Sequence, residues 1–463
     1  MTGSKHKISG GNLLSRRRFL QTTALLTGAA VSGFPGLLRA RGANGKLNVG
    51  FIGLGGQGRS RLKEILNCGV NVAALCDADE NQLSAAKASL PRTAGEAKIF
   101  LDYHELLASD VDAVVIATPD HWHAPIATAG LQAGKHVFAE KPLTHTIAEA
   151  RNLRTLAKQF PQLATQLGNQ GSASTNMRRA IELIQGNAIG AVREVHVWVA
   201  PSGSFKAGQE NPAGEDAVPA GLHWNNWIGP AAFRPYVRNV YHPRTWRAWY
   251  DFGGGSMADW GCHGLNLPVR ALKLDYPKNI ATDIPGAFTA GYPKDVRVRF
   301  DFAERNGLPP VTIWWYDGGR LPDANVVPQT VVDHFGEIPA EGVLLRGENG
   351  FTFGDPHAGA SYLQLADEKK LSGILKHAAT KNIVETLPRS PGHLKEWVNA
   401  CAGGPKTFSD FETGGKLTEI ALAGVVALRT RKALIWNGEA MRAENAPEAE
   451  KFIQAHYRED WKP

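Results

Sequence analysis

Residues 46–58, KLNVGFIGLGGQG, decide the fold of the first part of the chain. An apolar run, residues 47–52, leads into glycines, and a segment with helical spacing follows. A strand that enters a helix through G-x-G-x-x-G is typical of a dinucleotide-binding βαβ unit. In such a loop Gly53 permits the tight turn, Gly55 lets a pyrophosphate approach the backbone, and Gly58 allows close packing of helix and strand. The predicted cofactor-binding residues of the loop are Gly53, Gly55, Gly56, Gln57 and Gly58.

An acidic residue follows at the distance that such a site requires. Asp77 ends the second apolar run, 19 residues beyond Gly58. Its carboxylate is expected to accept hydrogen bonds from the adenosine ribose hydroxyls and to repel a 2′-phosphate, which favours NAD over NADP. A nearby arginine, Arg59 or Arg61, leaves NADP as an alternative. A strand, turn and helix without a ligand is the remaining interpretation, and the combined motif disfavours it.

Short apolar runs alternate with helical segments as far as residue 168. The predicted strands are residues 47–52, 70–76, 113–117, 136–139 and 163–167. This alternation predicts a mostly parallel sheet covered by helices on both faces. Ligands bind at the carboxyl ends of such strands. The loops after residues 113–117 and 136–139 are therefore predicted to line the cofactor site with Thr118, Pro119, His121, His123, Glu140 and Lys141.

Beyond residue 168 the pattern changes to that of a second domain. Residues 192–199, 296–302, 311–315 and 343–345 alternate or run apolar with few helices between them, and residues 413–434 form a helical stretch. An open, predominantly antiparallel sheet explains this pattern. The predicted fold is therefore α/β. It combines an N-terminal Rossmann domain, residues 44–168, with a C-terminal α+β domain for substrate binding and oligomer contacts, residues 169–463.

Aromatic residues gather in residues 221–266, which hold five of the twelve tryptophans. Tryptophan faces beside hydrogen-bonding side chains suit a carbohydrate, whose ring has apolar C–H faces and a polar rim. Each single tryptophan is better explained as core, but the cluster favours the wall of a sugar site. The predicted substrate-binding residues are His223, Trp224, Trp227, Trp246 and Arg247.

Two stretches together resemble a known family. VGFIGLGGQG (residues 49–58) and DVDAVVIATPDHWHAPIATAGLQAGKHVFAEKPL (residues 110–143) look like the glucose–fructose oxidoreductase and inositol dehydrogenase (Gfo/Idh/MocA) family. The resemblance extends from about residue 46 to about residue 438, and Glu-Lys-Pro is its most specific part. It implies an oxidoreductase that uses nicotinamide cofactors and acts on a sugar, polyol or glycoside. It also implies an open-sheet second domain and a homo-oligomer, either a dimer or a tetramer.

The resemblance also implies catalytic roles. In GGGSMADWGCHGLNLP (residues 253–268), Asp259 and His263 are spaced to share one helix face and resemble the Asp-x-x-x-His pair of the family. His263 is then the general base, Asp259 orients the substrate, and Lys141 stabilises the developing alkoxide. Two alternatives stay open. The same residues serve a redox-neutral, NAD-dependent glycosidase or lyase that oxidises the sugar ring transiently, or the chain is a cofactor- or sugar-binding protein without catalysis.

Other ligand classes are disfavoured. His121, His123, His223, His242 and His263 together with Asp259 suggest a metal site, but none of their spacings is a recognised ligand pattern, so no metal is predicted. The net charge of +7 belongs mostly to residues 1–40, which carry six lysines and arginines and no acidic residue. The rest holds 45 basic against 44 acidic residues. Nucleic-acid binding is therefore not expected.

The N-terminus resembles an export signal. Residues 15–20, SRRRFL, match the twin-arginine pattern, and a mildly apolar stretch and small residues follow. The apolar stretch, residues 22–38, contains three glycines and a proline, so a stable membrane span is not expected. Residues 1–43 are therefore predicted to be a signal peptide recognised by the twin-arginine machinery. Because that route carries folded proteins, we expect a periplasmic or otherwise exported protein with a tightly bound cofactor.

Overall fold

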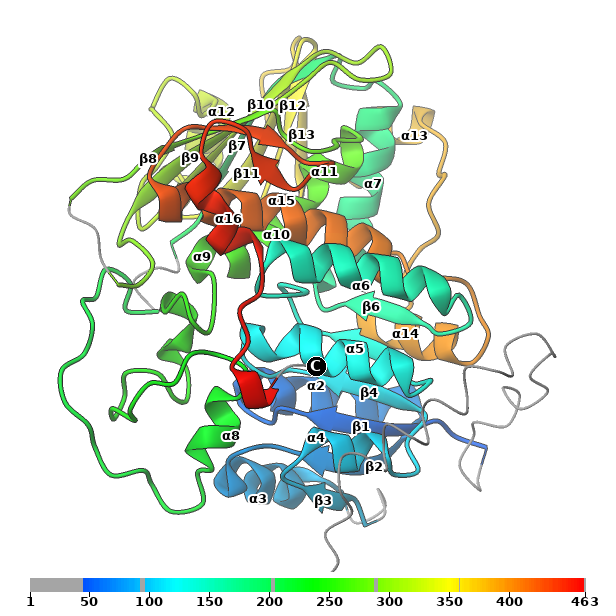
Figure 1. Ribbon diagram of the computed structural model, residues 1–463. Coiled ribbons are helices and arrows are strands. Elements are labelled where there is room, and N and C mark those ends of the chain that lie inside the picture. Colours follow the sequence, from blue (N-terminus) through cyan, green and yellow to red (C-terminus); the bar gives the residue numbers. More distant parts are fainter. Residues whose placement is uncertain (1–44, 92–95, 201–204, 287–289, 358, 462–463) are drawn as a thin grey trace, which may run out of the picture. The chain divides into compact units, whose positions relative to one another are not determined.

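The computed structural model describes residues 45–91, 96–200, 205–286, 290–357 and 359–461, and Figure 1 shows their arrangement. The predicted signal peptide, residues 1–43, lies outside the described residues. Within the described ranges, two separate sheets form the frame of the molecule. One has six strands and the other has ten.

The first sheet is parallel throughout and has the order β3-β2-β1-β4-β5-β6. Its strands are β1 Asn48–Ile52, β2 Asn71–Cys76, β3 Lys98–Phe100, β4 Ala113–Ile116, β5 His136–Ala139 and β6 Thr165–Leu167. Every residue of β4, with the sequence AVVI, is buried, as expected for a central strand with helices on both faces. The predicted Rossmann sheet is confirmed. The three-residue edge strand β3 is an addition to the prediction, because two of its residues are exposed and it has no apolar pattern.

Helices follow the strands of the first sheet in the predicted alternation. They are α2 Gly56–Ile65, α3 Glu80–Ser89, α4 Tyr103–Leu107, α5 His123–Gln132 and α6 Ile147–Gln159. A later helix, α14 His393–Cys401, also packs on this sheet, where Leu394 and Trp397 join a core with Val49 and Phe51. The C-terminal part of the chain therefore returns to cover the nucleotide-binding sheet.

The second sheet is mixed and mostly antiparallel, as predicted, with the order β14-β13-β12-β11-β7-β10-β9-β8-β15-β16. In the printed pairings of this sheet, β7 and β10 run parallel and the other pairs run antiparallel. The strands are β7 Val192–Trp198, β8 Asn279–Asp283, β9 Val296–Phe302, β10 Val311–Asp317, β11 Gly342–Gly347, β12 Gly350–Gly354, β13 Tyr362–Leu365, β14 Ser372–Gly373, β15 Leu434–Asn437 and β16 Arg442–Ala443. Strand β9, VRVRFDF, buries every second residue, which explains its alternating sequence.

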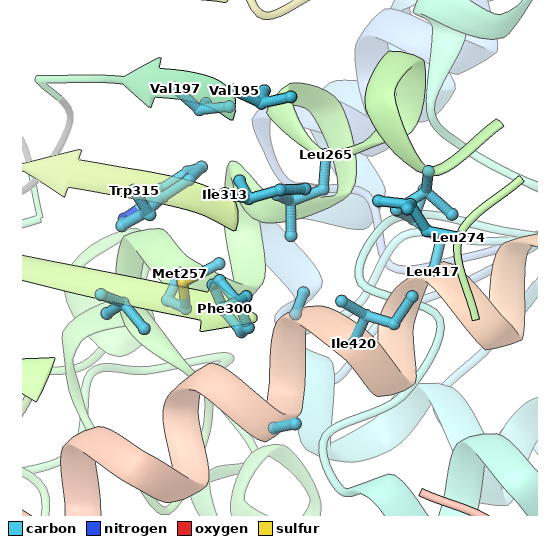
Figure 2. Packing of buried hydrophobic residues seen from close by; sticks show 14 of the residues in the cluster. Val195, Val197, Met257, Leu265, Leu274, Phe300, Ile313, Trp315, Leu417 and Ile420 are labelled. Atoms are coloured by element: carbon cyan, nitrogen blue, oxygen red, sulfur yellow. The ribbon is translucent and has the colours of Figure 1, made fainter. Parts of the chain in front are cut away.

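A long helix, α15 Phe411–Thr430, packs against the second sheet. In Figure 2 the side chains of Leu417 and Ile420 on α15 lie in the same core as Phe300 and Ile313 from the strands. The predicted helical stretch, residues 413–434, is too long at its C-terminal end. Arg431 adopts a left-handed conformation that ends the helix, and Leu434 begins β15.

Shorter helices complete the second domain: α7 Thr175–Gln185, α8 Trp224–Ile228, α9 Gly255–Asp259, α10 Gly261–Gly264, α11 Asn266–Ala271, α12 Gln329–Phe335, α13 Ala378–Asn382 and α16 Glu450–Ile453. Helix α15 packs on α6 of the first domain and on α9 and α10 of the second. It therefore braces the two short helices that carry Asp259 and His263. Over the described ranges, no helix has both the length and the apolar character needed to cross a membrane.

Candidate active site

The glycine loop after β1 leaves room for a ligand at its centre. Gly53 has φ +88°, and a Cβ there would lie 2.6 Å from backbone atoms of Ala117 and Thr118. A Cβ on Gly58 would lie 2.0 Å from the carbonyl oxygen of Gly53. At Gly55 and Gly56 a Cβ would meet nothing within 4 Å. The outer glycines therefore permit close backbone packing, while the inner two leave open the approach that a pyrophosphate needs, so the residues present fit NAD.

Asp77 ties the end of β2 to this loop. Its carboxylate oxygens accept hydrogen bonds from the backbone N–H groups of Leu54, at 2.6 Å, and Asp79, at 2.9 Å. Burial raises the pKa of Asp77 to about 6, although these hydrogen bonds favour the charged form. Arg59 and Arg61 are the two arginines for which NADP remained an alternative, and both have partners within the protein. Arg59 donates to the Leu54 carbonyl and to Gln82, and Arg61 pairs with Glu140.

The affinity for NAD is expected to fall about tenfold when the pH is lowered from 7 to 5, because NAD hydroxyls donate to ionised Asp77. With a pKa of about 6 in the free protein, protonation competes with NAD binding below that pH and not above it. A titration of NADH fluorescence at several pH values measures this dependence. Asp77→Asn should bind NADH weakly with a flat profile, and a flat profile for the unmodified protein would refute the assignment.

Three charged side chains meet at the end of β5. Lys141 Nζ donates to Asp259 Oδ1 at 2.7 Å, and Arg247 Nε lies 3.3 Å from the same oxygen. Asp259 is buried and Lys141 is nearly so. Burial opposes the charged form of Asp259, but Lys141 and Arg247 outweigh it and lower the pKa of this carboxyl. The structure thus brings two of the three predicted catalytic residues into direct contact and adds Arg247, which was predicted to bind substrate.

His263 lies about one helical turn beyond Asp259. It is buried, and its ring centroid lies 4.4 Å from that of His357. Its Nδ1 has no hydrogen-bond partner among the described residues. Burial, followed by the charge of Lys141, lowers the pKa of His263 well below its usual value. The imidazole is therefore uncharged at neutral pH and available to accept a proton.

Two further residues of this cluster were missed by the sequence analysis. Asp120, in the 3-10 turn Asp120–Trp122 after β4, is buried, and burial followed by the charge of Asp259 raises its carboxyl pKa well above the usual range. His357 comes from the loop after β12. Asp120 belongs to the quoted stretch TPDHWH and was therefore within reach of sequence reasoning. His357 belongs to no motif, and only the fold brings it to His263.

The predicted cofactor residues after β4 and β5 are tied together. His123 places one ring nitrogen 2.7 Å from the carbonyl of Pro142 and the other 3.0 Å from that of Thr118. Thr118 Oγ1 is buried and has no partner among the described residues. Pro119 begins the turn before His123. The imidazole of His123 therefore connects the two loops that border the cofactor site.

Glu140 connects the lysine segment to the glycine-loop helix. Its Oε1 accepts from Arg61 Nε at 2.6 Å and from Gln57 Nε2 at 3.2 Å, and both Arg61 and Gln57 lie on α2. Its Oε2 is buried without a partner among the described residues. The residue next to Lys141 is thus anchored to the helix that would bind the phosphates.

Three other predicted site residues, Trp224, Trp227 and His121, pack together in an aromatic cluster. Trp224 and Trp227 stack with their centroids 4.7 Å apart, and each is 6% exposed. This packing favours the core interpretation over the predicted sugar wall, because the indole faces cover each other. His121 packs between Trp227 and Phe252 in the same cluster.

His223 and Trp246 make contacts with different parts of the molecule. His223 Nε2 lies 2.8 Å from Glu80 Oε1 on α3, on the side of the first domain where Asp77 lies. Trp246 packs under Arg247, whose Cζ lies 4.3 Å from its ring centroid. Of the predicted substrate residues, Arg247 and Trp246 are therefore the ones near Asp259. Over the described ranges, no group of three or more His, Cys, Asp or Glu residues is arranged to hold a metal ion.

The parallel sheet, the glycine loop and Asp77 define a NAD-binding Rossmann domain, joined here to a second α/β domain. Residues 47–165 match the model GFO_IDH_MocA, described as "Oxidoreductase family, NAD-binding Rossmann fold". Residues 194–289 match GFO_IDH_MocA_C2, described as "Oxidoreductase family, C-terminal alpha/beta domain". The two matches support the Gfo/Idh/MocA oxidoreductase family, with NAD as the cofactor.

Curated relatives are similar over about a third of this chain or less. Inositol 2-dehydrogenase of Salmonella typhimurium (strain LT2) is 33% identical over 153 residues, which cover 32% of this chain and 45% of that protein. Glycosyl hydrolase family 109 protein 1 of Shewanella sp. (strain ANA-3) is 37% identical over 130 residues, 27% of this chain and 28% of that protein. The chain thus matches less than half the length of these relatives.

A solved structure is similar over more of the chain. The WlbA dehydrogenase from Bordetella pertussis, in complex with NADH and UDP-GlcNAcA, aligns with a TM-score of 0.57 and 14% identity. The alignment covers 85% of this chain and 99% of that one. At this identity the similarity is one of fold.

Proposed function

We propose that this protein is a NAD-dependent oxidoreductase that moves hydride between a hydroxyl-bearing carbon of a sugar, polyol or glycoside and a tightly bound cofactor. The observation that carries the proposal is the Lys141–Asp259 ion pair beside the uncharged His263. In the oxidation of an alcohol, an ammonium group can stabilise the developing alkoxide and an imidazole can accept the hydroxyl proton. The carbohydrate class is supported by the names of the relatives, which include an inositol dehydrogenase.

In the proposed reaction each group has a separate task. Asp259 holds the Lys141 ammonium in place, and that ammonium stabilises negative charge on the substrate oxygen. The His263 imidazole takes the proton from the substrate hydroxyl, while the hydride leaves the carbon that bears this hydroxyl. Bound NAD supplies the hydride acceptor. Arg247, also on Asp259, is placed to position the substrate.

A second candidate is redox-neutral cleavage of a glycoside, favoured by the similarity to glycosyl hydrolase family 109 proteins. Transient oxidation would acidify a ring proton, and its removal by a base would expel the aglycone and form a double bond. In hydrolysis water would add to that double bond, and the hydride would then return to the carbonyl carbon. Product analysis separates the two. Oxidised sugar formed in equal amount with NADH supports the oxidoreductase, and released aglycone without net NADH supports cleavage. A protein that carries no nicotinamide and does not bind added NAD would refute both.

We also propose export by the twin-arginine route, on the basis of Arg16 and Arg17 in SRRRFL. Because this route recognises the arginine pair itself, replacing both with lysine should retain the precursor in the cytoplasm. Cell fractionation with antibody detection measures the distribution. Equal export of the two forms would contradict the proposal.

A further inference from the structure

Residues 221–252, here called the aromatic segment, reach the first domain beside β2. The N–H of Glu80 donates to the carbonyl of Gly221 and the N–H of His223 donates to that of Ala78, both at 2.9 Å. His242 Nε2 lies 3.2 Å from Asp79 Oδ2. These contacts fall on the residues that directly follow Asp77. The aromatic segment is therefore fixed at the adenosine side of the cofactor site.

The same segment is also fixed beside β4. Trp122 Nε1 donates to the carbonyl of Trp227 at 3.0 Å, and His121 Nε2 lies 3.1 Å from the carbonyl of Ile228. The N–H of His121 donates to the carbonyl of Phe252 at 3.3 Å. Each of these contacts is made by the loop that follows β4.

The strand order places these two attachments on either side of the glycine loop. In the first sheet β1 lies between β2 and β4, and the glycine loop follows β1. A segment attached to the loops after β2 and β4 therefore spans the edge where the dinucleotide enters. Its own stability comes from the aromatic core of Trp224, Trp227, Tyr241 and Phe252.

A second element holds the aromatic segment from outside. Residues 454–461, here called the C-terminal tail, run from α16 back to α8 in Figure 1. Arg458 Nε donates to the carbonyl of Gly229 at 2.8 Å, and its Nη1 donates to Asn225 Oδ1 at 3.0 Å. Trp461 packs edge-on against Trp122 with centroids 5.5 Å apart. The tail thus connects the aromatic segment to the loop after β4.

We infer that the aromatic segment, clasped by the C-terminal tail, covers the adenosine half of bound NAD and sets the rate at which the cofactor leaves. NAD release then requires the segment to detach from at least one flanking loop, which breaks the contacts of Asp79 or of Trp122. Slow release follows because these contacts and the buried aromatic core must be given up before exit. The inference rests on the NAD site of the proposed function, not on the sugar chemistry.

The test measures NADH release from the full-length protein. The protein is loaded with NADH, mixed with a large excess of NAD, and the loss of bound-NADH fluorescence gives the release rate. We expect the double variant Arg458→Ala, Trp461→Ala to release NADH about tenfold faster or more, because three hydrogen bonds of Arg458 and the aromatic contact of Trp461 are lost. His242→Ala, at the opposite attachment, should also accelerate release.

Arg442→Ala provides the matched control, because Arg442 is also near the C-terminus but is exposed on β16. Its release rate should equal that of the unmodified protein. Thermal unfolding without NADH identifies any variant that has lost its fold. Unchanged release in both the tail variant and His242→Ala, with folding intact, would overturn the inference. If the unmodified protein fails to bind NADH, the proposed function itself is refuted.

Discussion

Lys141→Met is expected to lower the rate of hydride transfer about 10²- to 10³-fold, the usual loss when a single stabiliser of a developing oxyanion is removed. Methionine keeps the unbranched side chain and removes the ammonium that Asp259 holds at 2.7 Å. Arg247 remains on the same carboxylate, so Asp259 keeps a partner and the fold should persist. NADH affinity should change less than threefold.

The rate is measured in a single turnover of NAD-loaded protein, followed by absorbance of the nicotinamide. Lys158→Met is the matched control, because Lys158 is exposed on α6, and its rate should equal that of the unmodified protein. Hydride transfer in Lys141→Met within threefold of the unmodified rate would remove Lys141 from the mechanism.

The nucleotide-binding half was predictable because its determinants are local. A buried parallel strand has a continuous apolar sequence, and Gly58 is required by its contact with the Gly53 carbonyl within the same βα unit. Gly53 itself packs against the backbone of Ala117 and Thr118 after β4, but the sequence motif still marks it. The errors fall where local pattern is weak. Strand β3 has three mostly exposed residues, and β15 begins at Leu434 only because Arg431 ends the preceding helix in a left-handed conformation.

The site was predictable only in part, for a related reason. Lys141 and Asp259 were found from short motifs, and the fold brings them together. His357 reaches His263 from a different sheet loop, and nothing in its neighbouring sequence indicates that contact. The tryptophan cluster was visible in the sequence, but its role was not. Composition alone does not reveal whether indole faces point to a ligand or to one another, and here Trp224 and Trp227 cover each other.

Asp120 and Asp259 show how the fold differentiates chemically identical groups. Both carboxyls are buried in one cluster. Lys141 and Arg247 contact Asp259 and lower its pKa, whereas burial beside that charge raises the pKa of Asp120. Neighbouring carboxyls with pKa values displaced in opposite directions are characteristic of sites that handle protons. The raised pKa of Asp120 therefore opposes the accumulation of two negative charges in the cluster.

His263→Asn is expected to lower the rate of alcohol oxidation about 10²- to 10⁴-fold, the contribution of a positioned general base. In the unmodified protein, the pH dependence of the oxidation rate should reveal the protonation of His263. Only the uncharged imidazole accepts a proton, and burial together with Lys141 lowers the pKa of His263 well below 6.5. Acidification should therefore reduce the rate only below pH 6.5.

The rate of hydride transfer measured as a function of pH tests this assignment. His357→Gln removes a neighbouring imidazole that disfavours the charged form of His263, so it should move the decline toward higher pH. His104→Asn, at an exposed position on α4, should leave the profile unchanged. Because asparagine does not titrate, the His263→Asn variant should lose the decline altogether. If it instead retained both the rate and the decline, another group would have to take the hydroxyl proton.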